Sequence, residues 1–271
     1  MKLIYGLSVR NRKMYFDLKN RNSFLGAKQL EFRINSIDDD SEMEDTQYWE
    51  IISEECKKKE IKISIHMFDS INLGERVNCV REVYLKAIKK LIDLIVGVGG
   101  EYIVLHLGMG GFSYESHKKK ERLMIVVDSL QMLLSYCPSN IYIAIENMIR
   151  IESAYKCYLG DCKEDFLFIF DRIDDPRLKM IFDVGHANIK QLVPPIVFID
   201  QLYNKILAFH LHWNDGNSDQ HNILTENWMM EYDQLWKGYI MDKPIIIENN
   251  NIIDMHKTIR ILTNIIKDTK K

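Results

Sequence analysis

The sequence has few cysteines and no long apolar run, and both shortages exclude whole classes of protein. Five cysteines are scattered through 271 residues without a C-x-x-C pair, so we expect reduced thiols in the cytoplasm and no disulfide framework. No run approaches the roughly 18 apolar residues of a membrane span. The first residues read directly into a strand pattern, so we also expect no signal peptide.

Glycine motifs for nucleotide binding are lacking, and so is an excess of basic residues. No G-x-G-x-x-G follows the first expected strand and no G-x-x-x-x-G-K-[ST] occurs anywhere, which predicts no nucleotide cofactor. The chain has 36 Lys and Arg residues against 39 Asp and Glu, which gives a net charge of −3. This balance argues against a broadly basic surface that coats nucleic acid.

Short apolar runs alternate with segments of helical spacing along the chain. With 46% hydrophobic residues, a chain of this length can bury one large core, so residues 1–271 are expected to form a single domain. Eight strands separated by helical segments imply a parallel α/β sheet and predict a closed (β/α)8 TIM barrel. The expected strands are 3–8, 27–35, 62–66, 102–106, 141–146, 179–183, 206–209 and 243–248. The expected helices include 78–96, 116–135 and 166–173, whereas the link between the first two strands reads as a charged connection.

Six of these strands finish on a side chain that can bind a metal ion. These side chains belong to His66, His106, Glu146, Asp183, His212 and Glu248. The loops add His186, which lies three residues after Asp183, and the neighbouring pair Asp219 and His221. Because the carboxyl ends of barrel strands open onto one face, all nine side chains are expected to converge there.

A metal site explains this convergence better than surface polarity does. A lone histidine or glutamate at a strand end is usually a hydrogen-bonding residue, but four neighbouring buried carboxylates repel one another without compensating cations. Mixed His, Asp and Glu ligands without Cys suit zinc, manganese or iron(II). Nine ligands can serve two or three ions, with Glu146 as a bridge, and such ions both activate water and stabilise an in-line displacement. This pattern predicts phosphoester hydrolysis.

Further polar residues are expected to play smaller parts. His210 has the same strand parity as His212 but lies one pleat deeper, which predicts a core histidine or one that holds a ligand in place. His117 and His256 are expected on helix surfaces. The candidates for supporting the ligands are Asn72, Asn147, Asn214 and Asp215.

The order and spacing of these residues, from about 60 to 250, are similar to those of the xylose-isomerase-like TIM-barrel superfamily. The full set resembles endonuclease IV, the family of abasic-site DNA repair nucleases with three zinc ions. The motifs that carry the resemblance are Ser64-Ile-His66 with Ile71-Asn72-Leu73, Leu105-His106-Leu-Gly108, Ile145-Glu146-Asn147, Phe182-Asp183-Val-Gly-His186-Ala187, His212-Trp-Asn-Asp215, Asp219-Gln-His221 and Ile247-Glu248.

The resemblance implies a division of the ligands among three ions. One zinc would be bound by His66, His106 and Glu146. A second would be bound by Glu146, Asp183, His212 and Glu248, and a third by His186, Asp219 and His221. Glu248 would also orient the attacking hydroxide, and the bridging Glu146 would complete the catalytic pair. The implied activity is hydrolysis of DNA at abasic sites.

Sugar and sugar-phosphate isomerases and epimerases of the same superfamily are the alternative. They use one divalent ion, which Glu146, Asp183, His212 and Glu248 would hold here, and two glutamates act as acid and base beside a carbonyl. The surplus ligands, including His66 and His106, favour hydrolysis over this alternative. A third possibility is a barrel whose ions are structural.

Several residues depart from the nuclease pattern and bear on the substrate. Asp69 stands where endonuclease IV places an aromatic residue that enters DNA, and the acidic run 38–45 would repel phosphate. The basic residues that could hold a DNA backbone are Lys118, Lys119, Lys120 and Arg150. Abasic DNA is therefore one expected partner, and a small phosphate or sugar substrate is the other.

Overall fold

The computed structural model describes residues 4–20, 24–34, 43–111, 116–151, 157–190, 194–226, 238–239 and 242–268. Within these ranges, no helix is both long enough and apolar enough to cross a membrane. Residues 38–42 of the acidic run lie outside the described residues, whereas its last residues, Glu44 and Asp45, make ion pairs with Lys90 and Arg12. The cytoplasmic location stays a prediction.

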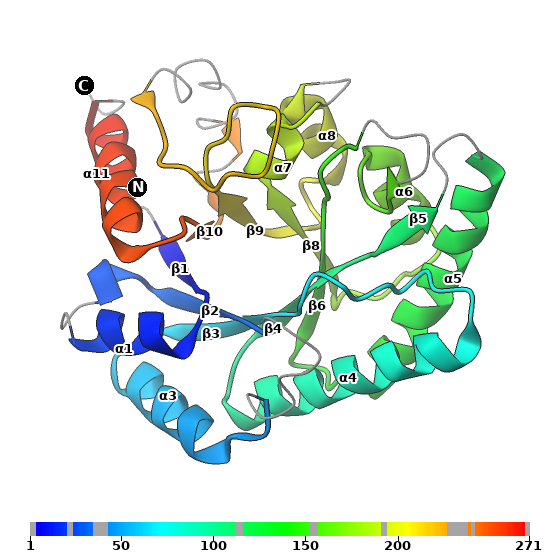
Figure 1. Cartoon of the computed structure of the whole chain (residues 1–271), viewed down its shortest axis with the longest axis horizontal. Helices are drawn as coiled ribbons and strands as arrows, with labels where there is room; N and C mark the ends of the chain where they lie inside the picture. The colour runs from blue at the N-terminus through cyan, green and yellow to red at the C-terminus, as the bar shows by residue number, and fades with distance from the viewer. Residues whose placement is uncertain are drawn as a thin grey trace.

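Eight parallel strands close into a barrel, which confirms the predicted (β/α)8 fold (Figure 1). Around the barrel the order is β1-β10-β9-β8-β6-β4-β3-β2, so β1 pairs with β10 and closes the ring. The strands are β1 (Tyr5–Val9), β2 (Gln29–Arg33), β3 (Lys62–His66), β4 (Tyr102–His106), β6 (Tyr142–Glu146), β8 (Leu178–Asp183), β9 (Ile206–Leu211) and β10 (Ile245–Ile247).

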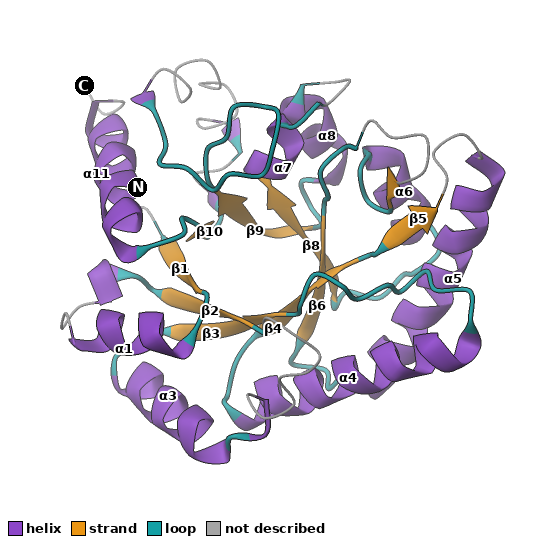
Figure 2. Cartoon of the chain, viewed as in Figure 1, coloured by secondary structure: helices purple, strands orange, loops and turns teal. Residues whose placement is uncertain are grey.

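Helices surround the ring of strands (Figure 2). They are α1 (Arg12–Asn20), α3 (Thr46–Lys58), α4 (Asn78–Gly97), α5 (Ser116–Tyr136), α6 (Lys163–Phe170), α7 (Val184–Asn188), α8 (Pro195–Leu202) and α11 (Ile252–Asp268), with a 3-10 turn η1 (Phe24–Gly26). The expected helices 78–96 and 116–135 match α4 and α5 to within one residue. The helix expected at 166–173 begins earlier, at Lys163, because Glu164 and Asp165 occupy its first turn, where carboxylates are favoured.

Two elements differ from the expectation of simple strand and helix alternation. The charged connection after β1 contains α1, which is held by three buried side chains, Met14, Tyr15 and Leu18. A small antiparallel sheet also joins β5 (Met109–Gly111) to β7 (Cys157–Tyr158), two loop segments about 50 residues apart. This sheet lies beyond the ends of β4 and β6.

Two apolar clusters divide the core. The larger cluster packs the outer face of the barrel against the helices, and it includes Ile103, Ile143 and Phe182. The smaller cluster, Tyr102, Val104, Ala144, Ile181 and Ala208, occupies alternate positions on the same strands and therefore fills the barrel interior. Following the same alternation toward the carboxyl ends, the interior positions become His106, Glu146, Asp183 and His210. The polar site thus rests directly on the interior core.

Candidate metal centre

All nine residues expected to bind metal lie at the carboxyl end of the barrel. His66, His106, Glu146 and Asp183 are the last residues of β3, β4, β6 and β8. His212 and Glu248 each follow a strand by one residue, His186 lies in α7, and Asp219 and His221 lie in the loop after β9. The structure therefore brings all nine together, and their binding of metal stays a prediction.

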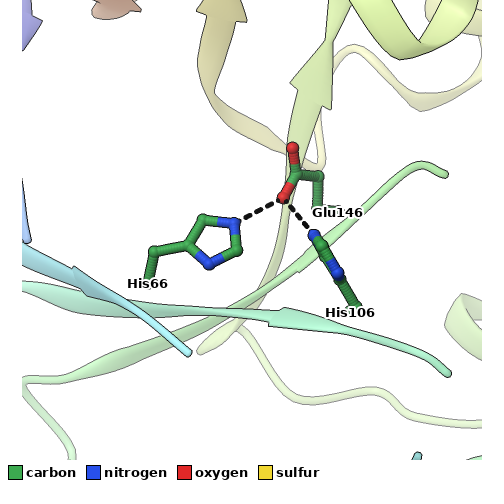
Figure 3. A group of neighbouring side chains, drawn as sticks. All are labelled: His66, His106 and Glu146. Atoms are coloured by element: carbon green, nitrogen blue, oxygen red, sulfur yellow. Dashed lines mark hydrogen bonds and ion pairs between the residues drawn. The ribbon is translucent and has the colours of Figure 1, made fainter. Parts of the chain in front are cut away.

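The first group consists of His66, His106 and Glu146 (Figure 3). The Nε2 atoms of the two histidines lie 2.8 and 3.0 Å from the same oxygen, Oε2 of Glu146. His66 Nδ1 lies 2.6 Å from the carbonyl oxygen of Met67, which makes Nδ1 the protonated nitrogen. Nε2 of His66 then carries its lone pair toward the carboxylate, and two electron-rich atoms at this distance require a proton or a cation between them.

The second group is built around Asp219. Its Oδ2 lies 3.1 Å from His221 Nε2 and 3.4 Å from His186 Nε2, and its Oδ1 lies 3.3 Å from His212 Nε2. His212 Nε2 is also 3.3 Å from Asp183 Oδ1. In both His186 and His221, Nδ1 lies 2.8 Å from a backbone carbonyl, which leaves Nε2 free for a ligand role.

A third group was not recognised from the sequence. Ligand atoms of Glu31, His210 and Glu248 lie within 4.8 Å of one another, and the same holds for Glu146, Asp183 and His210. Glu31 and His210 are both fully buried. In the sequence, Glu31 is marked only by lying on the same side of its strand as Gln29 and Arg33. In the structure, this polar side of the strand faces the barrel interior.

The charges of the site reinforce one another. Burial raises the pKa of the Glu146 carboxyl, but the neighbouring histidines, His210 first, bring that pKa well below its usual value. Burial lowers the pKa of His186 and of His210, yet the surrounding carboxylates raise both pKa values well above the ordinary histidine value. Without cations, these histidines would compensate the buried carboxylates as imidazolium ions.

Several buried atoms of the site make ion-pair contacts at 3.3 Å or more but no hydrogen bond, which tests whether a metal would fit. Within the described part of the chain, no hydrogen bond reaches Asp183 Oδ2, Glu248 Oε1 or either ring nitrogen of His212. Buried polar atoms are normally satisfied, so these atoms call for an additional group. Oxygen and imidazole nitrogen are ligands of zinc, manganese and iron(II). The donor set therefore fits a divalent ion, and neither its identity nor the number of ions follows from the residues.

The ligand positions depend on close packing by neighbouring groups. Asn147 Nδ2 donates to the Asp183 carbonyl at 2.9 Å, and the Asp183 amide donates back to Asn147 Oδ1 at 2.7 Å. Asn214 Nδ2 donates to the carbonyl of Gly185 at 2.8 Å. A Cβ atom at Gly185 would lie 2.1 Å from Cε1 of His212, so only glycine leaves room for that ring. These contacts agree with the supporting roles expected of Asn147 and Asn214.

A pocket of about 130 Å³ opens beside the cluster. Its lining residues are Arg33, Asp69, His106, Glu146, Met148, Ile149, Tyr158, His186, Asp219 and Glu248. Arg33 lies 2.9 Å from Asp69 and 3.8 Å from Glu248. Asp69, which stands where endonuclease IV has an aromatic residue, therefore makes an ion pair with Arg33. A larger hollow of about 370 Å³ between α3 and α4 has no histidine in its lining.

Lys119, the central residue of the lysine run that was expected to hold DNA, makes ion pairs within the protein. Lys119 Nζ lies 2.6 Å from Asp161 and 2.8 Å from Asp165, so its charge is taken up within the protein. His256 is exposed on α11 as expected, whereas the side chain of His117 lies outside the described residues.

A barrel of eight parallel strands with histidines and carboxylates gathered at their carboxyl ends defines a class of α/β-barrel with a site suited to divalent metal. A family profile described as xylose isomerase-like TIM barrel matches residues 24–265. The chain belongs to this family, which confirms the superfamily part of the resemblance.

Individual relatives resemble the chain over most of its length. An uncharacterized protein of Methanocaldococcus jannaschii is 29% identical over 214 residues, which cover 75% of this chain and 69% of the relative. A structure described as a D-tagatose 3-epimerase-like protein matches with a TM-score of 0.81 and 24% identity, covering 99% and 98% of the two chains. D-psicose 3-epimerase from Clostridium cellulolyticum, determined with D-tagatose, matches with a TM-score of 0.69 and 14% identity, covering 97% and 92%.

These likenesses bear on the choice between the two enzyme classes. At such identities the structural matches establish the shared fold alone. The two structures are described as an epimerase-like protein and a sugar epimerase, and neither description mentions endonuclease IV. The sequence placed the chain in the correct superfamily, but the preference for abasic DNA gains no support.

Proposed function

We propose that this chain is a sugar or sugar-phosphate isomerase or epimerase that uses a divalent metal held by Glu146, Asp183, His212 and Glu248. The observation that carries the proposal is their placement at the ends of four neighbouring strands, β6, β8, β9 and β10. All four side chains are buried, and three of them contain atoms without a hydrogen bond in the described residues. The sugar epimerases among the structural relatives support the same choice.

The protein groups around the pocket suit proton transfer at a carbon beside a carbonyl. When bound, a divalent ion there would polarise the sugar oxygens. Glu146 and Glu248 both line the pocket, so one carboxylate can remove the proton while the other group supplies one. Met148 and Ile149 supply apolar side chains to the same lining. The limited volume of the pocket, about 130 Å³, suits a small substrate.

A multinuclear phosphodiesterase is the second candidate, and one observation favours it. His66 and His106 converge on Glu146, and Asp219 and His221 converge on His212. The four-residue metal set does not require His66, His106, Asp219 or His221. These additional groups could hold further ions, as in a hydrolase with several metals. Zinc is the ion that this candidate implies.

Metal content and substrate turnover separate the two candidates. The purified chain would be analysed for metal by elemental analysis, then assayed with manganese, cobalt or zinc against a panel of ketoses, aldoses and their phosphates. We expect turnover of at least one sugar or sugar phosphate and one ion per chain needed for activity. An abasic-site duplex is assayed in parallel. Nicking of this duplex with about three ions per chain, and no sugar turnover, would overturn the proposal in favour of the second candidate.

A further inference from the structure

A buried polar chain lies beneath the proposed metal site, inside the barrel. At its upper end His210 lies on β9, and at its lower end Gln29 lies on β2. Gln29 Nε2 donates to Ser64 Oγ at 2.9 Å, and Ser64 Oγ donates to Glu31 Oε2 at 3.1 Å. Glu31 Oε1 then lies 2.8 Å from His210 Nε2, an ion-pair contact that does not have hydrogen-bond geometry. The chain thus connects the barrel interior to the residues of the site.

His210 links this chain to two of the four proposed ligands. Its Nδ1 lies 2.9 Å from Glu146 Oε1 and 3.4 Å from Glu248 Oε1. Both ring nitrogens therefore face carboxylate oxygens, Glu31 on one side and the proposed ligands on the other. The ring is fully buried and stacks on His66 with centroids 5.8 Å apart, so packing leaves it little freedom to rotate.

The contact of His210 determines how Glu146 presents its carboxylate. His66 and His106 approach Oε2 of Glu146, whereas His210 approaches Oε1. A carboxylate held from both oxygens has a fixed plane, and that plane decides which lone pairs face an ion in the site. Glu31 has no access to the pocket, because it is fully buried below the ring of His210. Its ion-pair contact with the site is made through His210, which lies between Glu31 and the proposed ligand Glu146.

We propose that His210, oriented by Glu31, is a positioning residue that fixes the carboxylates of Glu146 and Glu248 for metal binding and is not itself a ligand. The inference rests on the metal site of the proposed function. It explains why a charged pair is retained in the interior of the barrel, where burial of unpaired charge is unfavourable. The pair acts by geometry on the ligands rather than on the substrate.

Metal binding by the stripped full chain tests this inference. Cobalt(II) would be titrated into wild type, His210→Gln, Glu31→Gln and the double variant, with calorimetry giving affinity and ion count and visible absorption reporting the ligand set. We expect His210→Gln to weaken the affinity about 10- to 100-fold, the range for loss of a partner of a metal ligand, with the ion count and absorption bands unchanged. His256→Gln, an exposed histidine on α11, is the matched control and should bind as wild type.

The double variant tests whether Glu31 acts through His210. We expect Glu31→Gln to weaken binding as well, and the double variant to bind no more weakly than His210→Gln alone. Multiplied effects in the double variant would overturn this relation. Unchanged affinity in His210→Gln would overturn the positioning role, and loss of an ion or altered absorption bands would identify His210 as a ligand instead.

Two further results keep the inference separate from folding and from the proposed activity. If His210→Gln does not fold, Glu31→Gln, which preserves side-chain size, decides the matter: unchanged affinity in that variant overturns the inference. A wild type that binds cobalt but converts no sugar refutes the proposed function, while the affinities of the variants still decide the role of His210. A wild type that binds no divalent ion would overturn both.

Discussion

Glu146 divides its two carboxylate oxygens between different neighbours. Oε2 meets His66 and His106, whereas Oε1 meets His210. A change at Glu146 therefore disturbs three histidines at once and cannot separate catalysis from the arrangement of the site. Glu248 is held less closely: its Oε1 makes no hydrogen bond with the described residues, and Arg33, His210 and His221 lie 3.4 to 3.8 Å from its carboxylate. Its side chain also lines the pocket. Glu248 is the better probe of acid and base chemistry.

Glu248→Gln is expected to remove most of the sugar-converting activity while the chain remains folded. Glutamine matches glutamate in size but cannot accept a proton from carbon, so kcat should fall roughly 10²- to 10⁴-fold. Turnover of the best sugar in the panel, together with circular dichroism of the variant, measures this. His256→Gln serves as the control and should keep wild-type kcat. A kcat for Glu248→Gln within about twofold of wild type would rule out its role as acid or base.

His221→Gln distinguishes the single-ion reading from the multinuclear reading at one residue. His221 Nε2 lies 3.1 Å from Asp219, but neither residue belongs to the proposed set of four ligands. We expect the variant to keep the ion count of wild type and to lose less than about tenfold in kcat/KM, since the change alters the surroundings of His212 and Glu248 but removes none of the four ligands. Elemental analysis and steady-state assays give both values. Loss of one ion per chain would show that His221 is a ligand.

At the scale of elements, the turn before β8 is held by an ion pair. Arg177 Nη2 donates to Asp175 Oδ2 at 2.6 Å and Arg177 Nε donates to Asp175 Oδ1 at 3.0 Å, a two-point contact. Arg177 Nη1 also donates to the carbonyl of Cys137, which follows α5. The pair therefore fixes the entry of β8, the strand that ends at Asp183, relative to the end of α5.

Asp175→Asn is expected to destabilise the chain in a pH-dependent way. The hydrogen bonds from Arg177 lower the pKa of Asp175, so its contribution is present above the unfolded-state pKa of about 3.9 and is lost as pH falls below it. Urea unfolding should show a loss of about 0.5–1 kcal/mol at pH 7, as expected for a partly exposed pair, shrinking toward zero near pH 3. Asp128→Asn on the exposed side of α5 is the control. A difference that is independent of pH would contradict the ionic origin.

The regular elements could be predicted from the sequence because their signals are local. The apolar runs that end at His66 and His106 give β3 and β4 their observed bounds, since each run stops where polar loop residues begin. In contrast, α1 contains mainly charged and polar residues and is held by tertiary burial of Met14, Tyr15 and Leu18. The β5–β7 sheet pairs two short segments distant in sequence, which no local pattern can reveal.

The candidate site was predictable where ligand-type residues terminate strands, and hidden where they lie within one. The alternation Gln29-Leu-Glu-Phe-Arg33 in β2 has the pattern of a strand whose polar side meets water. In a closed barrel that side faces the interior, so Glu31 is fully buried and meets His210. Only the closure of the ring, a property of all eight strands together, places these two residues in contact.

At the scale of the whole molecule, the proposed ligands connect distant parts of the chain. Glu146 and Glu248 are separated by about a hundred residues, and the four strands β6, β8, β9 and β10 make up half of the ring. Several carboxylates lie together at this end, where Arg33 neutralises part of the charge. Without a divalent ion, compensation of the remaining charge depends on protonation of the histidines. Metal binding should therefore stabilise the entire barrel.

Removal of metal is expected to lower the melting temperature of the chain. A ligand present at about 100 times its Kd stabilises the folded state by about 2.7 kcal/mol, which for a chain of this size corresponds to a Tm shift of about 5–10 °C. Calorimetric scans of chelator-treated protein, before and after manganese is restored, measure the shift. The Tm of Asp183→Asn should change much less when metal is removed, because this variant lacks one of the four proposed ligands. Equal Tm values with and without metal in wild type would mean that no ion joins these strands.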